Sequence, residues 1–216
     1  MLAMLLAAAS LLAAPDKLHV LNGTVEKVTY KGREAVKLNI AKGKEESDED
    51  MMAIVPGTDF EDGTLEVDVS GAPRPGTGPT SKGFVGLAFR VQKEAEAFEM
   101  FYIRPVNGRI GDQAMRNHST QYVSTPGYGW KKLREEHPWV YESYADLEPG
   151  KWTHLKIVVS GDKAQLYVNG ASQPALIVND LKQGRSRGAV ALWGHCTTDA
   201  YFSGLKIVPA KAKTSG

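Results

Sequence analysis

Residues 152 to 169 read Trp152-Thr-His-Leu-Lys-Ile-Val-Val-Ser160, then Gly161-Asp162, then Lys163-Ala-Gln-Leu-Tyr-Val-Asn169. Two runs rich in β-branched and aromatic residues flank a Gly-Asp pair, which is the turn chemistry of a two-residue β-hairpin. The stretch therefore predicts two antiparallel strands, and it indicates the fold class for the rest of the chain.

Working outward, the same two-residue period recurs along the sequence. In 65–69, Leu65, Val67 and Val69 share one face, while Glu66 and Asp68 take the other. Further strands are predicted at 83–91, 98–104, 175–179, 188–193 and 201–208. Turn residues recur about every 8–12 positions, which favours an all-β sandwich or barrel over a βαβ fold.

Composition limits the class of protein. The chain has 216 residues with 26 basic and 25 acidic side chains, and it contains no basic stripe. Nucleic acid and anionic membrane surfaces are therefore poor candidate partners. The single cysteine, Cys196, excludes an internal disulfide and cysteine-rich zinc modules. We expect one domain over 16–210 and a disordered tail at 211–216, since all-β sandwiches of this size commonly form one unit.

The N-terminal stretch 1–15, MLAMLLAAASLLAAP, is apolar. It is too short to span ~30 Å of hydrocarbon, but it has the length of a signal-peptide core with Ala13 and Ala14 at the cleavage site. The first basic residue is Lys17, so the usual positive start is missing. Either the start is truncated or the segment is a disordered or packed helix. No later segment is apolar enough to cross a membrane, and a cleaved leader predicts a periplasmic or secreted product.

Two stretches interrupt the strands. Residues 42–50 are strongly charged but lack calcium-loop spacing, so we expect a solvated loop. Residues 107–149 form a long insert, rich in aromatic residues, with a helical turn predicted at 130–136. Connections this long are usually functional or disordered, and disordered segments contain few aromatics. The insert is therefore predicted to be ordered and to contribute to a site.

Several segments together resemble segments of bacterial concanavalin A-like domains, the first three of them successive sheet strands. They are 60–69, 83–90, 98–105, 121–126, 130–134, 152–159, 164–170 and 202–207. The set is similar to the laminin-G-like and 3-keto-disaccharide hydrolase-like branch of the concanavalin A-like lectin/glucanase superfamily, over roughly residues 18 to 208. The resemblance implies a two-sheet antiparallel jelly-roll β-sandwich with a ligand groove on its concave sheet, often used on sugars. Fold alone does not decide function.

A glucanase activity can be tested against the residues. Retaining glycosidases need two carboxyl groups ~5–5.5 Å apart, and in the glucanase branch they occupy a Glu-x-Asp-x-x-Glu motif. Here Glu66-Val-Asp68 copies the first half, but Gly71 takes the last position. We therefore expect Glu66 and Asp68 to form the solvent face of an ordinary strand. The sequence contains no readable metal motif, nucleophile elbow or phosphate loop, and it leaves any cofactor undefined.

The predicted strands and the insert together suggest a carbohydrate site. Arg90 shares a face with Phe84 and Ala88, and Tyr102 shares one with Arg104. If neighbouring strands turn these faces to the groove, Arg90, Tyr102 and Arg104 converge there; rim ion pairs are the alternative for the arginines. Aromatic faces with amide or guanidinium donors are groups that bind sugars. The predicted ligand-binding set is Arg90, Tyr102, Arg104, Asn117, His118, Gln121, Tyr122, Trp130 and Arg134.

His118 is the candidate general acid/base, because its unperturbed pKa lies near neutrality. On a 3-keto sugar it would remove the proton beside the carbonyl, with Arg90 or Arg104 stabilising enolate charge. The predicted catalytic set is thus His118, Arg90 and Arg104; a His118 that only hydrogen-bonds is the alternative. His195, which follows Trp193 at a strand end, is expected to be structural.

Three functional classes remain open. The first is an exported carbohydrate-binding domain, the second a glycoside-processing enzyme resembling 3-keto-disaccharide hydrolases, and the third a laminin-G-like protein-interaction domain. Because no complete catalytic constellation can be identified, the sequence favours the first.

Overall fold

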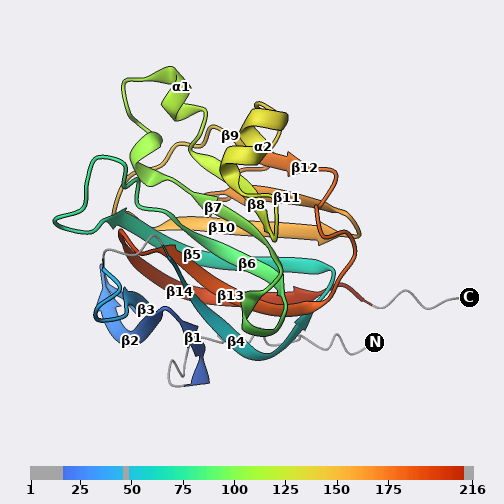
Figure 1. The fold of residues 1–216 in the computed structure, drawn as a ribbon, viewed down its shortest axis with the longest axis horizontal. Helices are drawn as coiled ribbons and strands as arrows, with labels where there is room; N and C mark the ends of the chain where they lie inside the picture. The colour runs from blue at the N-terminus through green and yellow to red at the C-terminus, as the bar shows by residue number, and fades with distance from the viewer. Residues whose placement is uncertain (1–16, 46–48, 212–216) are drawn as a thin grey trace, which may run out of the picture.

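The structure, a computed structural model, describes residues 17–45 and 49–211. These residues form two facing antiparallel β-sheets (Figure 1). The predicted signal segment 1–15 and most of the predicted tail, from residue 212, lie outside the described residues.

The first sheet has seven strands, ordered as β1 (His19–Leu21), β4 (Asp50–Phe60), β13 (Gly188–His195), β6 (Val85–Val91), β7 (Phe98–Ile103), β8 (Thr120–Thr125) and β9 (Glu142–Ser143). The second sheet also has seven, ordered as β12 (Leu176–Val178), β11 (Lys163–Val168), β10 (Thr153–Ser160), β5 (Gly63–Pro73), β14 (Thr198–Pro209), β3 (Arg33–Ile40) and β2 (Gly23–Tyr30). The predicted two-sheet antiparallel sandwich is confirmed.

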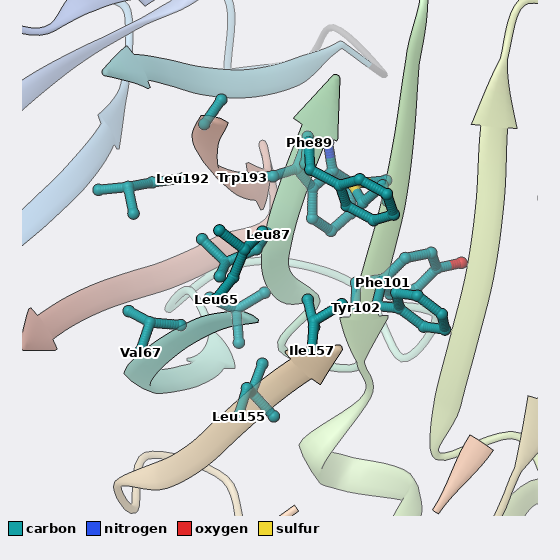
Figure 2. Close-up of a cluster of buried hydrophobic side chains, with 14 of the residues drawn as sticks. Leu65, Val67, Leu87, Phe89, Phe101, Tyr102, Leu155, Ile157, Leu192 and Trp193 are labelled. Atoms are coloured by element: carbon teal, nitrogen blue, oxygen red, sulfur yellow. The ribbon is translucent and has the colours of Figure 1, made fainter. Parts of the chain in front are cut away.

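The hydrophobic core lies between the sheets. Leu65 and Val67 of β5 project from the second sheet, and Leu87 and Phe89 of β6 project from the first (Figure 2). All four side chains are fully buried. Strand alternation therefore sends one face of each central strand into the core and the other outward.

The predicted strands and the observed strands agree closely. The Gly161-Asp162 hairpin joins β10 to β11, and Gly161 adopts φ 64°, the left-handed conformation that favours glycine. The helical turn predicted at 130–136 is α2 (Trp130–Glu136). The strands β1 to β4, β8 and β9 were not among the predicted strands.

The segment 107–149 is not solely an insert, because it contributes two strands to the first sheet. It contains α1 (Gln113–Arg116), β8, α2 and β9, and β8 pairs with β7 along its whole length. Figure 1 shows α1 and α2 at the β8–β9 end of the molecule. The strand β7 is buried on both faces.

Two short 3₁₀ turns complete the fold, at Lys93–Ala95 and at Pro105–Asn107. The second turn redirects the chain from β7 toward α1 and places Asn107 at the sheet's outer face. Within the described residues, no helix has the length and apolar character needed to cross a bilayer.

Candidate functional site

A cleft of about 820 Å³ lies on the outer face of the first sheet. The alternation of β7 sends Met100 and Tyr102 into it, while Phe101 and Ile103 point to the core. Trp193 of β13 and Val123 of β8 extend the same floor on either side. The walls come from the loop at residues 79–82 and from the segment that carries α1 and α2.

Aromatic rings form much of the cleft floor. The rings of Tyr102 and Trp193 have centroids 5.0 Å apart, and Phe84 lies 5.2 Å from His195. The Arg104 guanidinium lies over the Tyr102 ring at 5.0 Å from its centroid, within cation–π range. The floor thus offers flat apolar surface beside fixed charge.

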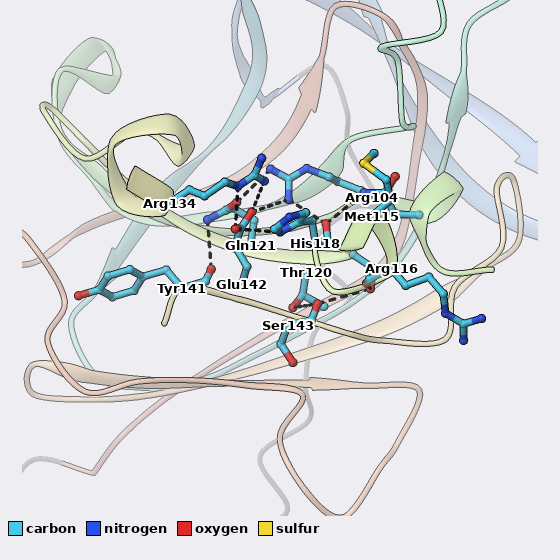
Figure 3. Close-up of polar contacts among 12 residues, drawn as sticks. Arg104, Met115, Arg116, His118, Thr120, Gln121, Arg134, Tyr141, Glu142 and Ser143 are labelled. Atoms are coloured by element: carbon cyan, nitrogen blue, oxygen red, sulfur yellow. Dashed lines mark hydrogen bonds and ion pairs between the residues drawn. The ribbon is translucent and has the colours of Figure 1, made fainter. Parts of the chain in front are cut away.

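Arg104 organises the polar end of the cleft (Figure 3). Its Nη2 donates to the Tyr102 hydroxyl at 2.8 Å and to Oε1 of Gln121 at 3.0 Å. Its Nη1 donates to the carbonyl of His118 at 2.9 Å and lies 3.4 Å from Oε1 of Glu142. The side chain is almost fully buried, so these contacts hold one fixed orientation of the guanidinium.

Glu142 is the centre of the charge cluster. Only 2% of its side chain is exposed, and two arginines and a histidine surround its carboxylate. Arg134 from α2 donates to both carboxylate oxygens, with Nε at 2.9 Å from Oε2. Nδ1 of His118 lies 2.9 Å from the same Oε2. This geometry compensates the cost of burying the carboxylate.

His118 lies between this carboxylate and the cleft. Burial lowers the pKa of its imidazole; Glu142 opposes that shift, and Arg134 and Arg104 add to it. Trp139, which is 60% exposed, stacks on the imidazole ring at 5.4 Å with an interplanar angle of 5°. Burial thus disfavours the charged imidazole, and Nδ1, although close to Glu142, has no hydrogen-bond partner within residues 17–45 and 49–211.

Three buried polar atoms of the cleft lining have no hydrogen-bond partner in the described part of the chain; one is Nδ1 of His118, which lies close to Glu142 without a hydrogen bond. The other two are the amide oxygen Oδ1 of Asn107 and the indole nitrogen Nε1 of Trp193. Leaving such a group unpaired costs about 1–3 kcal/mol. Burial also raises the pKa of Tyr102 to about 12, so its hydroxyl stays protonated. Hydroxyl groups, which both donate and accept, are the kind of partner that these atoms lack.

Most of the predicted site residues meet in this cleft. Five of them line it: Tyr102, Arg104, His118, Trp130 and Arg134. Gln121 lies beneath the lining, where its amide bonds Arg104 and the carbonyls of Tyr122 and Tyr141. Whether any of them is catalytic stays a prediction.

Arg90 does not converge with Tyr102 and Arg104, and that expectation is wrong. The strand β13 pairs Ala189 with Val91 but Ala191 with Ala88, so β6 contains an extra residue. Arg90 adopts φ 55° at this bulge, and strict alternation ends there. Its fully buried side chain bonds the carbonyls of Glu61, Gly161 and Gly184 and the carboxylate of Asp62. Arg90 is a structural link at one end of the sandwich.

Tyr122 and Asn117 are also not in the cleft. Because Gln121 and Val123 face outward on β8, Tyr122 faces the core side, where its hydroxyl donates to the buried Glu99. Burial raises the pKa of both Tyr122 and Glu99. Asn117 ends α1, and its Oδ1 accepts from Gln113 within that helix. Both residues support the fold around the site.

Sequence reasoning missed several cleft residues. Asn107 ends the short turn that begins at Pro105, and Glu142, which lies behind His118, belongs to a two-residue strand too short for any period to be read. Trp193 and His195 were identified as a strand end, and His195 was expected to be structural, yet both line the cleft. Both residues lie in β13. The sequence could not predict that this strand pairs with β6, and that pairing is what brings the two residues to the cleft.

The half-motif Glu66-Val-Asp68 lies elsewhere, on the outer face of the second sheet. Both carboxylates contact His154, at 3.7 Å and 2.9 Å. They are about a quarter exposed, as a solvent-facing strand predicts. Among residues 17–45 and 49–211, no group of three or more His, Cys, Asp or Glu side chains is arranged to hold a metal.

Comparison with known proteins gives one family and many similar folds. Residues 18–208 match the model of the 3-keto-alpha-glucoside-1,2-lyase-like domain. No curated protein matches the sequence. The carbohydrate binding module CBM66 from Bacillus subtilis is similar in structure at 18% identity and a TM-score of 0.59, over 88% of this chain and 93% of that one.

Two further structures share the fold at lower identity. A galectin-like protein of unknown function from Bacillus subtilis has a TM-score of 0.58 at 11% identity, over 88% of each chain. The Ca²⁺/Man-bound exoplasmic/lumenal domain of VIP36 has a TM-score of 0.58 at 9% identity, over 93% of this chain and 86% of that one. At these identities the likeness establishes a lectin-like sandwich.

Proposed function

The chain belongs to the 3-keto-alpha-glucoside-1,2-lyase-like domain family, and on that premise we propose that it binds a saccharide in the cleft of the first sheet. The observation that carries the proposal is a cleft that combines an aromatic floor with buried, unpaired polar atoms. Sugar rings pack their C–H faces on aromatic rings and exchange hydrogen bonds with amides and guanidinium groups. The cleft's volume also lies within the range of ordinary ligand sites.

The similar structures support the same ligand class. One is named a carbohydrate binding module, and another was described with mannose bound. Export to the periplasm or the exterior is a further part of the proposal, and it rests on the apolar sequence of residues 1–15.

We expect saturable binding of α- or β-linked glucose disaccharides, or of their 3-keto derivatives, in isothermal titration calorimetry. Replacing Trp193 with phenylalanine keeps an aromatic ring and removes the unpaired indole N–H, so affinity is expected to fall about tenfold. Tyr167→Phe is the matched control, because Tyr167 lies on the second sheet and bonds Gln165. Absence of binding at millimolar sugar, or equal affinities for the two variants, would contradict the proposal.

A second candidate function, elimination on a 3-keto glycoside, is favoured by the His118–Glu142 pair. Neutral His118 takes the proton from C2, and the electron pair forms an enolate whose C3 oxygen lies in the field of Arg104. The enolate then restores the C3 carbonyl, forms the C1–C2 double bond and expels the C1 oxygen, which takes the proton from His118. The products are an unsaturated keto sugar and the free alcohol. Glu142 stabilises the imidazolium formed between the two steps.

This candidate predicts a pH profile. The base must be unprotonated, and burial lowers the pKa of His118, so the rate should fall on acidification with a midpoint below the ordinary histidine value of about 6.5. His118→Gln should reduce release of the alcohol by at least about a hundredfold. Sugar binding should persist, as calorimetry would show. Undiminished turnover by a folded His118→Gln would eliminate His118 as the base.

A further inference from the structure

A second, shallower depression of about 380 Å³ lies on the outer face of the second sheet, away from the cleft. Asp68 of β5 and His154 of β10 are directly paired across the sheet, and both point outward because Val67, Val69 and Leu155 fill the core. The remaining lining residues are Arg33, Trp152, Asn169 and Gly170. The site is therefore built from four chain segments on the sheet opposite to the cleft.

The lining side chains hold one another in place. Arg33 pairs with Asp68 through Nη1, and its guanidinium lies over the Trp152 ring at 5.6 Å from the centroid. The other oxygen of Asp68 lies 2.9 Å from Nδ1 of His154, and Oδ1 of Asn169 accepts from the backbone N–H of His154. The acceptor and donor groups are thus preorganised side by side.

Several hydrogen-bonding groups of the depression are nevertheless unused. Arg33 engages only Nη1 in a hydrogen bond, and the side-chain nitrogen of Asn169 has no partner within the described residues. Nε1 of Trp152 is shielded from solvent and is likewise without a partner in that part of the chain. These groups are all donors, and their residues line the same depression as the carboxylate acceptor of Asp68.

We propose that this depression is a second saccharide site, specific for neutral sugars. Vicinal hydroxyls both donate and accept, so they fit a carboxylate beside guanidinium and amide donors. The Asp68 carboxylate disfavours anionic ligands and the Arg33 guanidinium disfavours cationic ones, since like charges repel at short range. The Glu66-Val-Asp68 strand face thereby contributes to binding. The proposal is independent of the first cleft.

Two sites on opposite sheets have a consequence for the ligand. A short oligosaccharide cannot occupy both, so the protein would bind two chains, or two segments of one long chain. Occupying both sites raises the overall affinity for polysaccharide without any new contact. The proposal thus predicts stronger retention on polymers than on their short fragments.

The test follows the indole N–H resonances of Trp152 and Trp193 by ¹H–¹⁵N NMR, each assigned by its Trp→Phe variant. Maltohexaose, cellohexaose and xylohexaose are the neutral probes, and trigalacturonate is the anionic comparison. We expect a saturable shift of the Trp152 resonance with at least one neutral probe. Arg33→Ala should weaken that response at least about tenfold and change the Trp193 response less than about twofold.

Lys27→Ala is the matched control, because Lys27 is an exposed, ion-paired cation of the same sheet and does not line the depression. It should leave both responses unchanged. The proposal is overturned if no neutral probe shifts Trp152, if Arg33→Ala leaves its response unaltered, or if trigalacturonate binds there more tightly. A missing Trp193 response would instead contradict the first cleft, so the two failures are distinguishable.

Discussion

Replacing Arg90 with methionine is expected to lower the free energy of unfolding by about 3–5 kcal/mol. All three guanidinium nitrogens donate inside the protein, to three backbone carbonyls and to Asp62, and none of the side chain is exposed. Methionine fills much of the volume but leaves the carbonyls of Glu61, Gly161 and Gly184 without this donor. For a chain of this length, the midpoint temperature should fall by roughly 6–20 °C, measured by thermal and urea denaturation.

Arg185 supplies a matched control for this prediction. It contacts Glu61 and the same Asp62 at 3.3 Å and 3.5 Å, but 66% of its side chain is exposed. Exposed ion pairs contribute less than about 1 kcal/mol, so Arg185→Met should leave the midpoint nearly unchanged. Equal losses for the two variants would show that charge balance, rather than the buried hydrogen bonds of Arg90, stabilises this end of the sandwich.

The contrast between Arg90 and Arg104 shows how far alternation predicts a site. Both arginines lie at the end of a strand whose other residues follow a two-residue period. On β7 the period continues, and Arg104 joins Met100 and Tyr102 in the cleft as expected. On β6 a bulge includes Arg90, and nothing in the local sequence marks it, because the extra residue is defined only by pairing with β13.

The strands were predictable for a related reason. Residues of β5, β10 and β11 alternate strongly because one face of each meets the core and the other meets solvent. The strand β8 was hidden within a predicted insert, because it is buried on both faces and so lacks the polar alternation of a half-exposed strand. A strand that is buried on both faces lacks the alternation of apolar and polar residues by which a half-exposed strand is recognised in a sequence.

The charge cluster needed the three-dimensional structure. Arg104, His118 and Arg134 were all predicted from the sequence, but their shared partner Glu142 was not. It lies outside any readable period, and the contact depends on how the chain returns from α2 to the sheet edge. The contacts between the buried Glu142 carboxylate and three basic side chains form only in the folded chain. Composition and spacing therefore could not identify Glu142 as their partner.

Replacing Arg104 with alanine is expected to weaken saccharide binding in the cleft by about a hundredfold, or roughly 2.7 kcal/mol. The guanidinium donates hydrogen bonds to Tyr102, to Gln121 and to the carbonyl of His118. Its loss therefore removes the contacts that hold these residues in place on the floor and at one wall of the cleft. Arg104→Lys should lose nearly as much, because a single ammonium cannot reach these acceptors in one plane. Titration calorimetry with the tightest-binding saccharide measures both variants.

Arg109→Ala is the matched control for Arg104→Ala. Arg109 belongs to the same segment and bonds Asp146 at 2.6 Å, but it is exposed and does not line the cleft. Its replacement should change affinity less than about twofold, since an exposed pair contributes little even to folding.

Circular dichroism must show that Arg104→Ala remains folded, and Glu142 then keeps Arg134 as a partner. If a folded Arg104→Ala binds within about threefold of the native chain, saccharide recognition does not depend on this cluster, and other lining residues, such as Trp193 and His195, must hold the ligand.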